Sequence, residues 1–234
     1  MSEEFDFDKY WLSKFSSCIE EIAGREIRTS VMEGNEEISA QSTRQEVFDW
    51  SNEAMHRLSE LVNDEEKINI MTGCACRYST KSLEKYQKLY AETKDLKLVH
   101  QEFQNEFENF LETNLKIEDK YKEEILSRGM GAAGKLQGNK IIATKIPKSA
   151  FIKDWFEESD PIKKRAIFCH CPRIRDVLDK ENNVLPEHYC YCGAGFYKGI
   201  WEDILQKEVK VEVLESVIHG GEVCKIAIYL PEDV

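Results

Sequence analysis

The sequence predicts an α+β protein, with a helical N-terminal half packed on a C-terminal α+β domain whose antiparallel sheet ends in a β-hairpin. Apolar residues recur at helical spacing through most of residues 1–127, which is the pattern of amphipathic helices. After residue 128 two runs alternate apolar and polar residues, as strands do, and a glycine turn separates them. We therefore divide the chain into an acidic helical region, residues 1–127, and a cysteine-rich α+β domain, residues 128–234.

Three helical segments are expected in the first region. Residues 5–22 are expected to form the first helix. Thr43 and Glu46 have the spacing of a capping box, in which each side chain accepts a hydrogen bond from a backbone N–H of the first turn, so a helix is predicted to begin there. A further apolar stripe runs from about residue 79 to residue 112, either as one helix or as two with a break near Asp95.

A glycine-rich stretch, residues 128–138, follows the helical region. Its glycines match a dinucleotide-binding fingerprint by spacing: Gly129, Gly131 and Gly134. That fingerprint requires a strand before it and a helix after it, whereas here a helix precedes and a strand is expected over 140–146. Leu136 stands where a phosphate-binding loop carries Ser or Thr. We interpret the stretch as a flexible junction.

The remaining elements are short. Residues 165–168 are predicted to form a strand, and residues 173–188 are polar and rich in turn formers. A helix with a double apolar stripe is expected from Gly193. The alternating runs over 209–213 and 226–230 are predicted to pair as a hairpin, because glycine tolerates the positive φ of the tight turn between them.

The net charge of −12 lies entirely in residues 1–127, which hold 16 basic and 28 acidic side chains, whereas residues 128–234 hold 16 of each. An acidic chain is not expected to bind nucleic acid or an anionic membrane surface. No apolar run approaches the ~18 residues of a membrane span, and the first residues are too acidic for an export signal. We expect a cytoplasmic protein whose acidic face is solvated or docks a partner, with a homodimer left open.

Six of the eight cysteines form three Cys-x-Cys pairs, which in a reducing cytoplasm indicate metal or redox chemistry rather than disulfides. The pairs are Cys74 with Cys76, Cys169 with Cys171, and Cys190 with Cys192. Residues two apart on a strand lie about 6.6–6.8 Å apart, too far for two thiolates on one zinc ion with Zn–S bonds of about 2.3 Å. Such a pair binds one ion only where the backbone bends, as Pro172 and Gly193 suggest.

Four of these thiols match the number that a closed zinc site takes, and an iron–sulfur cluster takes four as well. The predicted metal ligands are Cys169, Cys171, Cys190 and Cys192. Further candidates for the ligand set are Cys74, Cys76, His170 and His188. Two alternatives stay open: buried thiols without a ligand, and a reversible redox switch.

The C-terminal third carries a resemblance in the segments CYCGAGFYKGIWEDIL and VEVLESVIHGGEVCKIAIYLP. Over roughly residues 165–231 it resembles the 4-vinyl reductase-type hydrocarbon-binding domain, and it is similar to the end of the aminothiazoline-carboxylate hydrolase-like family. The positions that match are Glu215, Gly220 and Cys224, none with a catalytic role. The first resemblance implies an α+β fold related to vesicle-tethering transport subunits, with an apolar pocket for a small ligand.

These features together predict a small-molecule-binding or sensor protein with a cysteine-based metal site. The expected pocket for a small apolar molecule is lined by Phe196, Tyr197 and Trp201. One alternative is a cysteine-dependent hydrolase of the aminothiazoline-carboxylate type, in which Cys192 is the nucleophile at a helix N-terminus with His188 nearby. The other alternative is a thiol redox switch.

Overall fold

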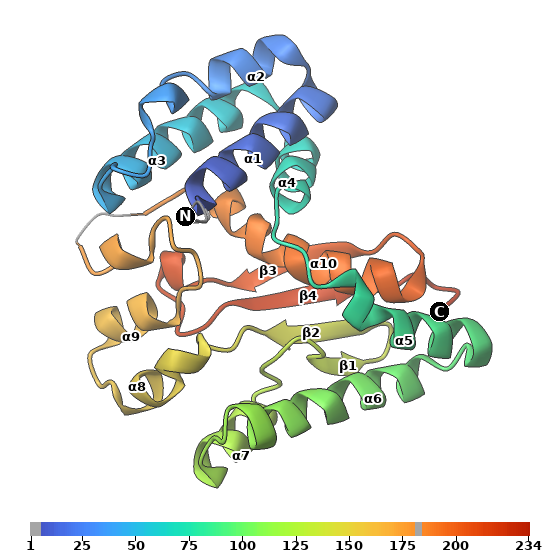
Figure 1. Ribbon diagram of the computed structural model, residues 1–234. Coiled ribbons are helices and arrows are strands. Elements are labelled where there is room, and N and C mark those ends of the chain that lie inside the picture. The colour runs from blue at the N-terminus through green and yellow to red at the C-terminus, as the bar shows by residue number, and fades with distance from the viewer. Residues whose placement is uncertain (1–5, 181–183) are drawn as a thin grey trace, which may run out of the picture. The chain divides into compact units, whose positions relative to one another are not determined.

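The computed structural model describes residues 6–180 and 184–234, and it confirms the α+β class (Figure 1). The chain folds into two compact units. Unit 1 comprises the described residues up to Cys76 together with Cys171–Gly195, and unit 2 comprises Arg77–His170 and Phe196–Val234. The predicted boundary at residue 128 falls inside unit 2.

Unit 1 is built mainly from helices. They are α1 (Phe7–Ala23), α2 (Arg25–Val31), α3 (Arg44–Leu61) and α4 (Asp64–Gly73). The predicted capping box is confirmed, because Thr43 accepts the Glu46 N–H and the Glu46 carboxylate accepts the Thr43 N–H. Helix α1 packs against α2 and α4, and its buried face carries Trp11, Phe15 and Ile19. Burial of this apolar stripe is the main source of stability for helices of this length.

The second segment of unit 1 returns to these helices through two 3₁₀ turns, Arg175–Val177 and Glu187–Cys190. Helix α10 (Tyr191–Leu205) then begins in unit 1 and ends in unit 2. A Cβ atom at Gly195 would collide with the Thr72 carbonyl oxygen and would lie 2.7 Å from Cβ of Ala75. Only glycine therefore allows the start of α10 to approach the end of α4 so closely.

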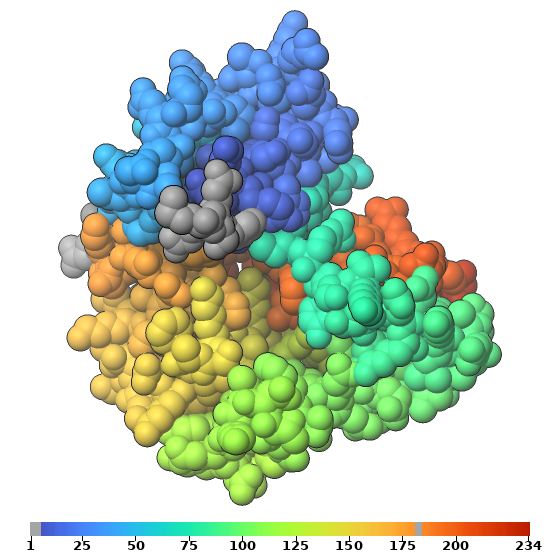
Figure 2. All heavy atoms as spheres, viewed as in Figure 1, coloured from blue at the N-terminus to red at the C-terminus, as the bar shows by residue number. Residues whose placement is uncertain are grey.

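Unit 2 contains α5 (Thr80–Thr93), α6 (Leu96–Asn109), a π-helical turn (Phe110–Asn114), α7 (Asp119–Ser127), α8 (Ile152–Glu157) and α9 (Pro161–Phe168). The side chains of α5, α6 and α7 form the continuous green surface of this unit in Figure 2. The apolar stripe from residue 79 is two helices, because Lys94 adopts a left-handed φ of 53° and Asp95 caps α6.

The strand predicted over residues 165–168 is wrong, since these residues end helix α9. The residues at the N-terminus of α9, and not its apolar last turn, favour the helix. Asp160 accepts the N–H groups of Ile162 and Lys163, and Pro161 occupies the first helical position, where its missing N–H costs nothing. The capping residues therefore outweigh the strand propensity of the short apolar run at residues 165–168.

An antiparallel sheet of order β1-β2-β4-β3 forms the other part of unit 2. Its strands are β1 (Lys135–Gln137), β2 (Lys140–Thr144), β3 (Lys210–Glu215) and β4 (Lys225–Tyr229). The predicted C-terminal hairpin is confirmed as β3 and β4, with Gly220 at a φ of 86° in the turn. The glycine-rich stretch is not the flexible junction predicted, because Gly131 donates to the Thr144 carbonyl at 2.9 Å and β1 follows it.

Within the two described ranges, no helix combines the length and the apolar character that crossing a membrane requires.

Candidate functional site

Four thiols lie near one another in unit 1, and we call them the thiol cluster: Cys18, Cys74, Cys171 and Cys192. They come from four separate segments, namely α1, the end of α4, the start of the second segment and the first turn of α10. The Cys74 and Cys192 side chains are hydrogen-bonded to each other, and Cys74 also interacts electrostatically with Cys18. Cys192 interacts in the same way with Cys171. The interactions therefore run from Cys18 through Cys74 and Cys192 to Cys171.

Glycine allows the first two of these segments to meet. A Cβ atom at Gly73, the last residue of α4, would lie 2.9 Å from Sγ of Cys18 and 3.8 Å from its Cβ. Real Cβ atoms do not approach a neighbour that closely, so a larger residue here would push α1 and α4 apart. The close approach places Cys18 beside the end of α4, one residue before Cys74.

Hydrogen-bond donors point at two of the sulfur atoms. The Trp11 indole Nε1–H donates to Sγ of Cys192 at 3.4 Å. Sγ of Cys171 lies 3.3 Å from the Tyr189 hydroxyl oxygen and also accepts the backbone N–H of Arg173. A neutral thiol is a weak acceptor, whereas a thiolate, whether bare or bound to a metal, is a strong one. The donors are thus arranged for sulfur in its anionic form.

Burial opposes the anionic form of two of these thiols. Cys74 is 1% exposed, and burial raises its pKa well above the ordinary value, although the Lys14 ammonium opposes the shift. Burial also raises the pKa of Cys171, against the opposing charge of Arg173. Both charged side chains that act on these two thiols are cations. Cys74 and Cys171 are therefore protonated in a cationic environment, which suits chemistry that removes their protons.

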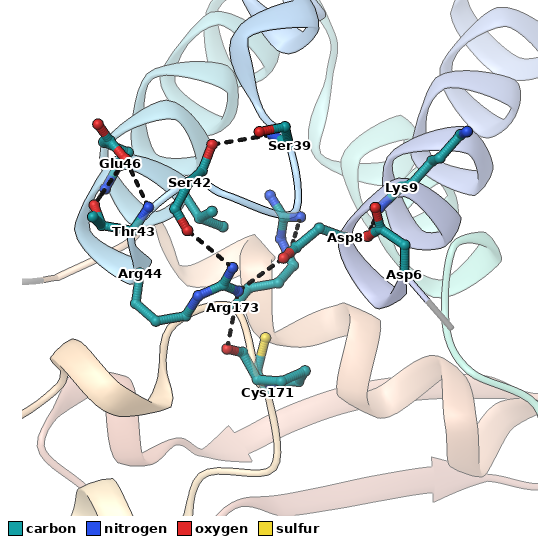
Figure 3. Close-up of polar contacts among 12 residues, drawn as sticks. Asp6, Asp8, Lys9, Ser39, Ser42, Thr43, Arg44, Glu46, Cys171 and Arg173 are labelled. Atoms are coloured by element: carbon teal, nitrogen blue, oxygen red, sulfur yellow. Dashed lines mark hydrogen bonds and ion pairs between the residues drawn. The ribbon is translucent and has the colours of Figure 1, made fainter. Parts of the chain in front are cut away.

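A buried ion cluster lies beside Cys171 (Figure 3). Arg173 is fully buried, and it donates to one Asp8 carboxylate oxygen at 2.7 Å and to the Ser51 hydroxyl at 2.9 Å. Its guanidinium also lies over the Trp11 ring, 4.4 Å from the centroid. These contacts fix the second segment of unit 1 onto α1 and α3.

Asp8 is shared between two cations. Its other carboxylate oxygen accepts a hydrogen bond from Arg44 at 2.8 Å, and the Arg44 side chain is 29% exposed. Nε of Arg173 is buried and has no hydrogen-bond partner in the described part of the chain. Two guanidinium groups and one carboxylate leave a net charge of +1 next to the thiol cluster, where low exposure weakens screening by water.

The predicted metal ligands do not all belong to the unit that holds the thiol cluster. Cys171, Cys190 and Cys192 belong to unit 1, whereas Cys169 caps the end of α9 in unit 2. Over residues 6–180 and 184–234, no three His, Cys, Asp or Glu side chains stand at metal-binding positions. Cys18, which the sequence analysis did not select, joins the cluster. Its spacing of seven residues from Trp11 places both on one face of α1, and this is the signal that identifies it.

The two candidate histidines each contact a backbone carbonyl. The His170 ring contacts the Ile146 carbonyl within unit 2. The His188 ring is hydrogen-bonded to the Met55 carbonyl, and burial together with Lys67 lowers its pKa to about 4. Nε2 of His188 is buried and has no hydrogen-bond partner among the described residues. His188 is therefore not hydrogen-bonded to Cys192 as a base would be.

The expected pocket residues lie on the part of α10 that belongs to unit 2. Tyr197 and Trp201 are buried, and Phe196 is half-buried. The Trp201 ring stacks on His100 with centroids 6.1 Å apart and meets Phe103 edge to face at the same distance. The indole N–H of Trp201 is buried without a hydrogen-bond partner in the described ranges. These residues form a packed aromatic cluster.

The positions matched in the resemblance organise the hairpin turn. The Glu215 carboxylate accepts the backbone N–H groups of Glu222 at 2.9 Å and Val223 at 3.2 Å. Gly220 supplies the left-handed conformation that the turn requires. Burial raises the pKa of Cys224. Two of the three positions therefore have roles in the turn, and the third is a protonated thiol at its end.

Comparison with known proteins gives one match. Residues 148–234 match the model of a family described as "Family of unknown function (DUF6144)". The matched range includes Cys171 and Cys192 of the thiol cluster but neither Cys18 nor Cys74. No curated protein and no solved structure matches the chain.

Proposed function

We propose that the protein is a thiol-based redox sensor whose reactive pair is Cys74 and Cys192. The observation that carries this proposal is the hydrogen bond between the two side chains. A disulfide requires Cβ atoms about 3.5–4.5 Å apart, and two thiols in hydrogen-bond contact are within a small movement of that separation. Cys74 ends α4 and Cys192 lies in the first turn of α10, so each is at an end of its helix, where the backbone adjusts most easily.

The two thiols have different roles in the proposed reaction. Cys192 is half-buried, lies at a helix N-terminus and receives the Trp11 N–H, all of which favour attack by its thiolate on an oxidant. Cys74 is buried, and its raised pKa keeps it protonated. Cys192 is therefore the attacking sulfur, and Cys74 is the resolving sulfur.

The oxidant is a hydroperoxide. The Cys192 thiolate attacks the terminal oxygen, the O–O bond breaks, the alcohol or water leaves after taking up a proton, and Cys192 becomes a sulfenic acid. The Cys74 sulfur then attacks the sulfenic sulfur, the S–O bond breaks, and the Cys74 proton leaves with the hydroxyl group as water. Two electrons pass from the thiols to the hydroperoxide, and a dithiol reductant reverses the change. The new disulfide would tie the end of α4 to a helix that continues into unit 2.

The test is treatment of the intact protein with hydrogen peroxide, followed by alkylation under denaturing conditions and mass spectrometry. We expect a loss of ~2 Da with one disulfide between Cys74 and Cys192. Cys192→Ser abolishes the disulfide, and Cys74→Ser leaves a sulfenic acid on Cys192 that dimedone captures. Cys224 is a half-buried thiol of unit 2, so Cys224→Ser is the matched control and should still form the disulfide between Cys74 and Cys192. A disulfide between other cysteines, or none, would overturn the proposal.

Binding of a small apolar molecule by unit 2 is a second candidate, favoured by the unpartnered Trp201 indole N–H. Buried indole N–H groups normally have an acceptor, and a ligand with a single acceptor atom would supply it. Native mass spectrometry of the protein as purified tests this candidate. A copurifying molecule that is lost in Trp201→Phe and retained in Trp50→Phe, whose indole N–H already donates to the Glu33 carbonyl, would support it. A protein with no bound molecule would count against it.

A further inference from the structure

We propose that Lys14 controls the resolving step of the redox reaction, because its ammonium group fixes the turn that follows Cys74 and supplies a positive charge for the Cys74 thiolate. This inference rests on the proposed redox function and adds the regulation of its second step. Lys14 lies on α1, three residues after Trp11, a spacing that places the two side chains on one face of the helix. Trp11 contacts Cys192, so this face of α1 serves both reactive thiols.

The Cys74 thiol is held in its protonated form by three features of its surroundings. Burial is the largest of them, because it disfavours the charged form. The thiol also donates a hydrogen bond to the Met71 carbonyl oxygen at 3.3 Å. Cys74 caps the C-terminus of α4, where the helix dipole disfavours a negative charge. Since the thiolate and not the thiol is the nucleophile, the attack on the Cys192 sulfenic acid is limited by the loss of this proton.

Lys14 brings a positive charge to this thiol. Its ammonium group donates to the carbonyl oxygen of Ala75, the residue that follows Cys74, and lies 5.5 Å from the centroid of the Tyr10 ring. Within residues 6–180 and 184–234 it forms no ion pair with a carboxylate.

The charge of Lys14 acts on Cys74 in a partly buried place. The Lys14 side chain is half-buried, so water screens its charge less than at an open surface. Burial raises the pKa of Cys74, and Lys14 is the group that lowers it. An ammonium group without a carboxylate beside a buried thiol suits a site whose anion is the thiolate that forms during the reaction.

The resolving step is a substitution at sulfur. The Cys74 thiolate attacks the sulfenic sulfur of Cys192, the S–O bond breaks, and the departing hydroxyl group takes up the Cys74 proton and leaves as water. Formation of the sulfenic acid has already consumed the hydroperoxide, so this step needs no further oxidant. Lys14 stabilises the negative charge on Cys74 until the neutral disulfide is complete. It contacts neither the oxidant nor the leaving group, and we therefore call it a positioning residue.

The test follows the Cys192 sulfenic acid in the full-length protein after a pulse of hydrogen peroxide. Dimedone is added at successive times, and mass spectrometry measures the remaining sulfenic acid and the Cys74–Cys192 disulfide. In Lys14→Met we expect the disulfide to form about tenfold more slowly near neutral pH, the effect of one nearby charge in a partly buried site. The difference from the wild type should shrink as the pH rises, since Cys74 then ionises without Lys14.

Two further variants separate this role from a purely structural one. Lys14→Arg keeps the positive charge, so it should keep the rate of the resolving step and its pH dependence. Lys9→Met removes the same charge from an exposed position of α1, and it should resolve as the wild type does. Circular dichroism of each variant verifies that the helices remain folded.

Three results would overturn the role of Lys14. These are a wild-type rate in Lys14→Met at every pH, an equal slowing at all pH values, or a failure of Lys14→Arg to restore the rate. In each of them the wild type still forms the Cys74–Cys192 disulfide, and the redox function stands. A wild type that never forms this disulfide refutes the redox function itself, and the role of Lys14 with it.

Discussion

Replacing Asp8 by Asn tests the ion cluster that holds unit 1 together. The substitution keeps the size of the side chain and removes its charge. Arg173, which is fully buried and 2.7 Å from Asp8, then loses the one carboxylate that it pairs with among the described residues and keeps the Ser51 hydroxyl as acceptor. Arg44 is partly exposed, so water can replace its lost contact. The cost therefore arises mainly at Arg173.

The expected loss is large for a single substitution. Breaking a buried ion pair by removing one partner typically costs about 3–5 kcal/mol, because the other charge stays buried and unpaired. Replacing Arg173 by Met in the same protein removes that unpaired charge. The double variant Asp8→Asn with Arg173→Met should thus lose less than the sum of the two single variants. We expect a coupling free energy of about 1–3 kcal/mol.

Hydrogen exchange followed by mass spectrometry is the appropriate assay, since it reports on unit 1 separately from unit 2. The free energy of opening is read from peptides of α1 and α3. Asp64→Asn is the control: this carboxylate pairs with Lys67 at 2.6 Å and is 94% exposed, so its loss should matter little. The reasoning is refuted if Asp8→Asn changes the protection of α1 and α3 no more than Asp64→Asn does.

Three further substitutions test local features of the fold. Gly195→Ala should destabilise unit 1 by about 1–3 kcal/mol, because its Cβ would collide with Thr72 at the end of α4. Thr43→Ala removes the cap of α3 and should cost about 1 kcal/mol, measured by urea denaturation. Burial lowers the pKa of His100 below its ordinary 6.5, despite its hydrogen bonds to the Gly134 and Ala133 carbonyls. The unfolded chain therefore binds the proton first, and stability is lost as the pH falls below 6.5, by at most about 1.4 kcal/mol per pH unit. His100→Gln should remove this part of the pH dependence.

Each of these substitutions has a matched comparison. Gly138 has nothing within 4 Å of its position for a Cβ, so Gly138→Ala carries only the strain of its positive φ and should cost less than Gly195→Ala. Thr43→Ser keeps the hydroxyl and should keep most of the stability. For His100, urea denaturation at pH 5.5 and 7.5 is compared between wild type and variant. An unchanged difference between the two pH values would contradict the assignment to His100.

Local signals in the sequence were sufficient for most of the fold. The cap at Thr43 and the alternation of the last two strands depend on neighbours a few residues away. The break at Asp95, which the structure contains, was left open by the sequence. Strand β1 was not predicted, because three residues are too few for a period to show. The strand expected at 165–168 failed for the same reason: a short apolar run fits a strand or the end of a helix equally well.

The candidate site was only partly predictable, because Cys-x-Cys spacing suggested that each pair acts together. In the structure Cys74 is buried and Cys76 is exposed, while Cys171 belongs to unit 1 and Cys169 to unit 2. The thiols meet through contacts that are distant in sequence, which spacing does not encode. The sequence did contain one signal of the site. Asp8 lies three residues before Trp11, so it places a charge on the apolar face of α1, where a charged side chain needs a partner.

The proposed redox reaction depends on the donor that faces Cys192. The Trp11 indole N–H donates to Sγ of Cys192 at 3.4 Å, and this hydrogen bond favours the thiolate that attacks the oxidant. Trp11→Phe keeps an aromatic ring and removes the donor, so the variant should form the Cys74–Cys192 disulfide more slowly than the wild type. The measurement is the rate of disulfide formation by mass spectrometry at equal peroxide. Equal rates in the two proteins would show that this donor does not activate Cys192.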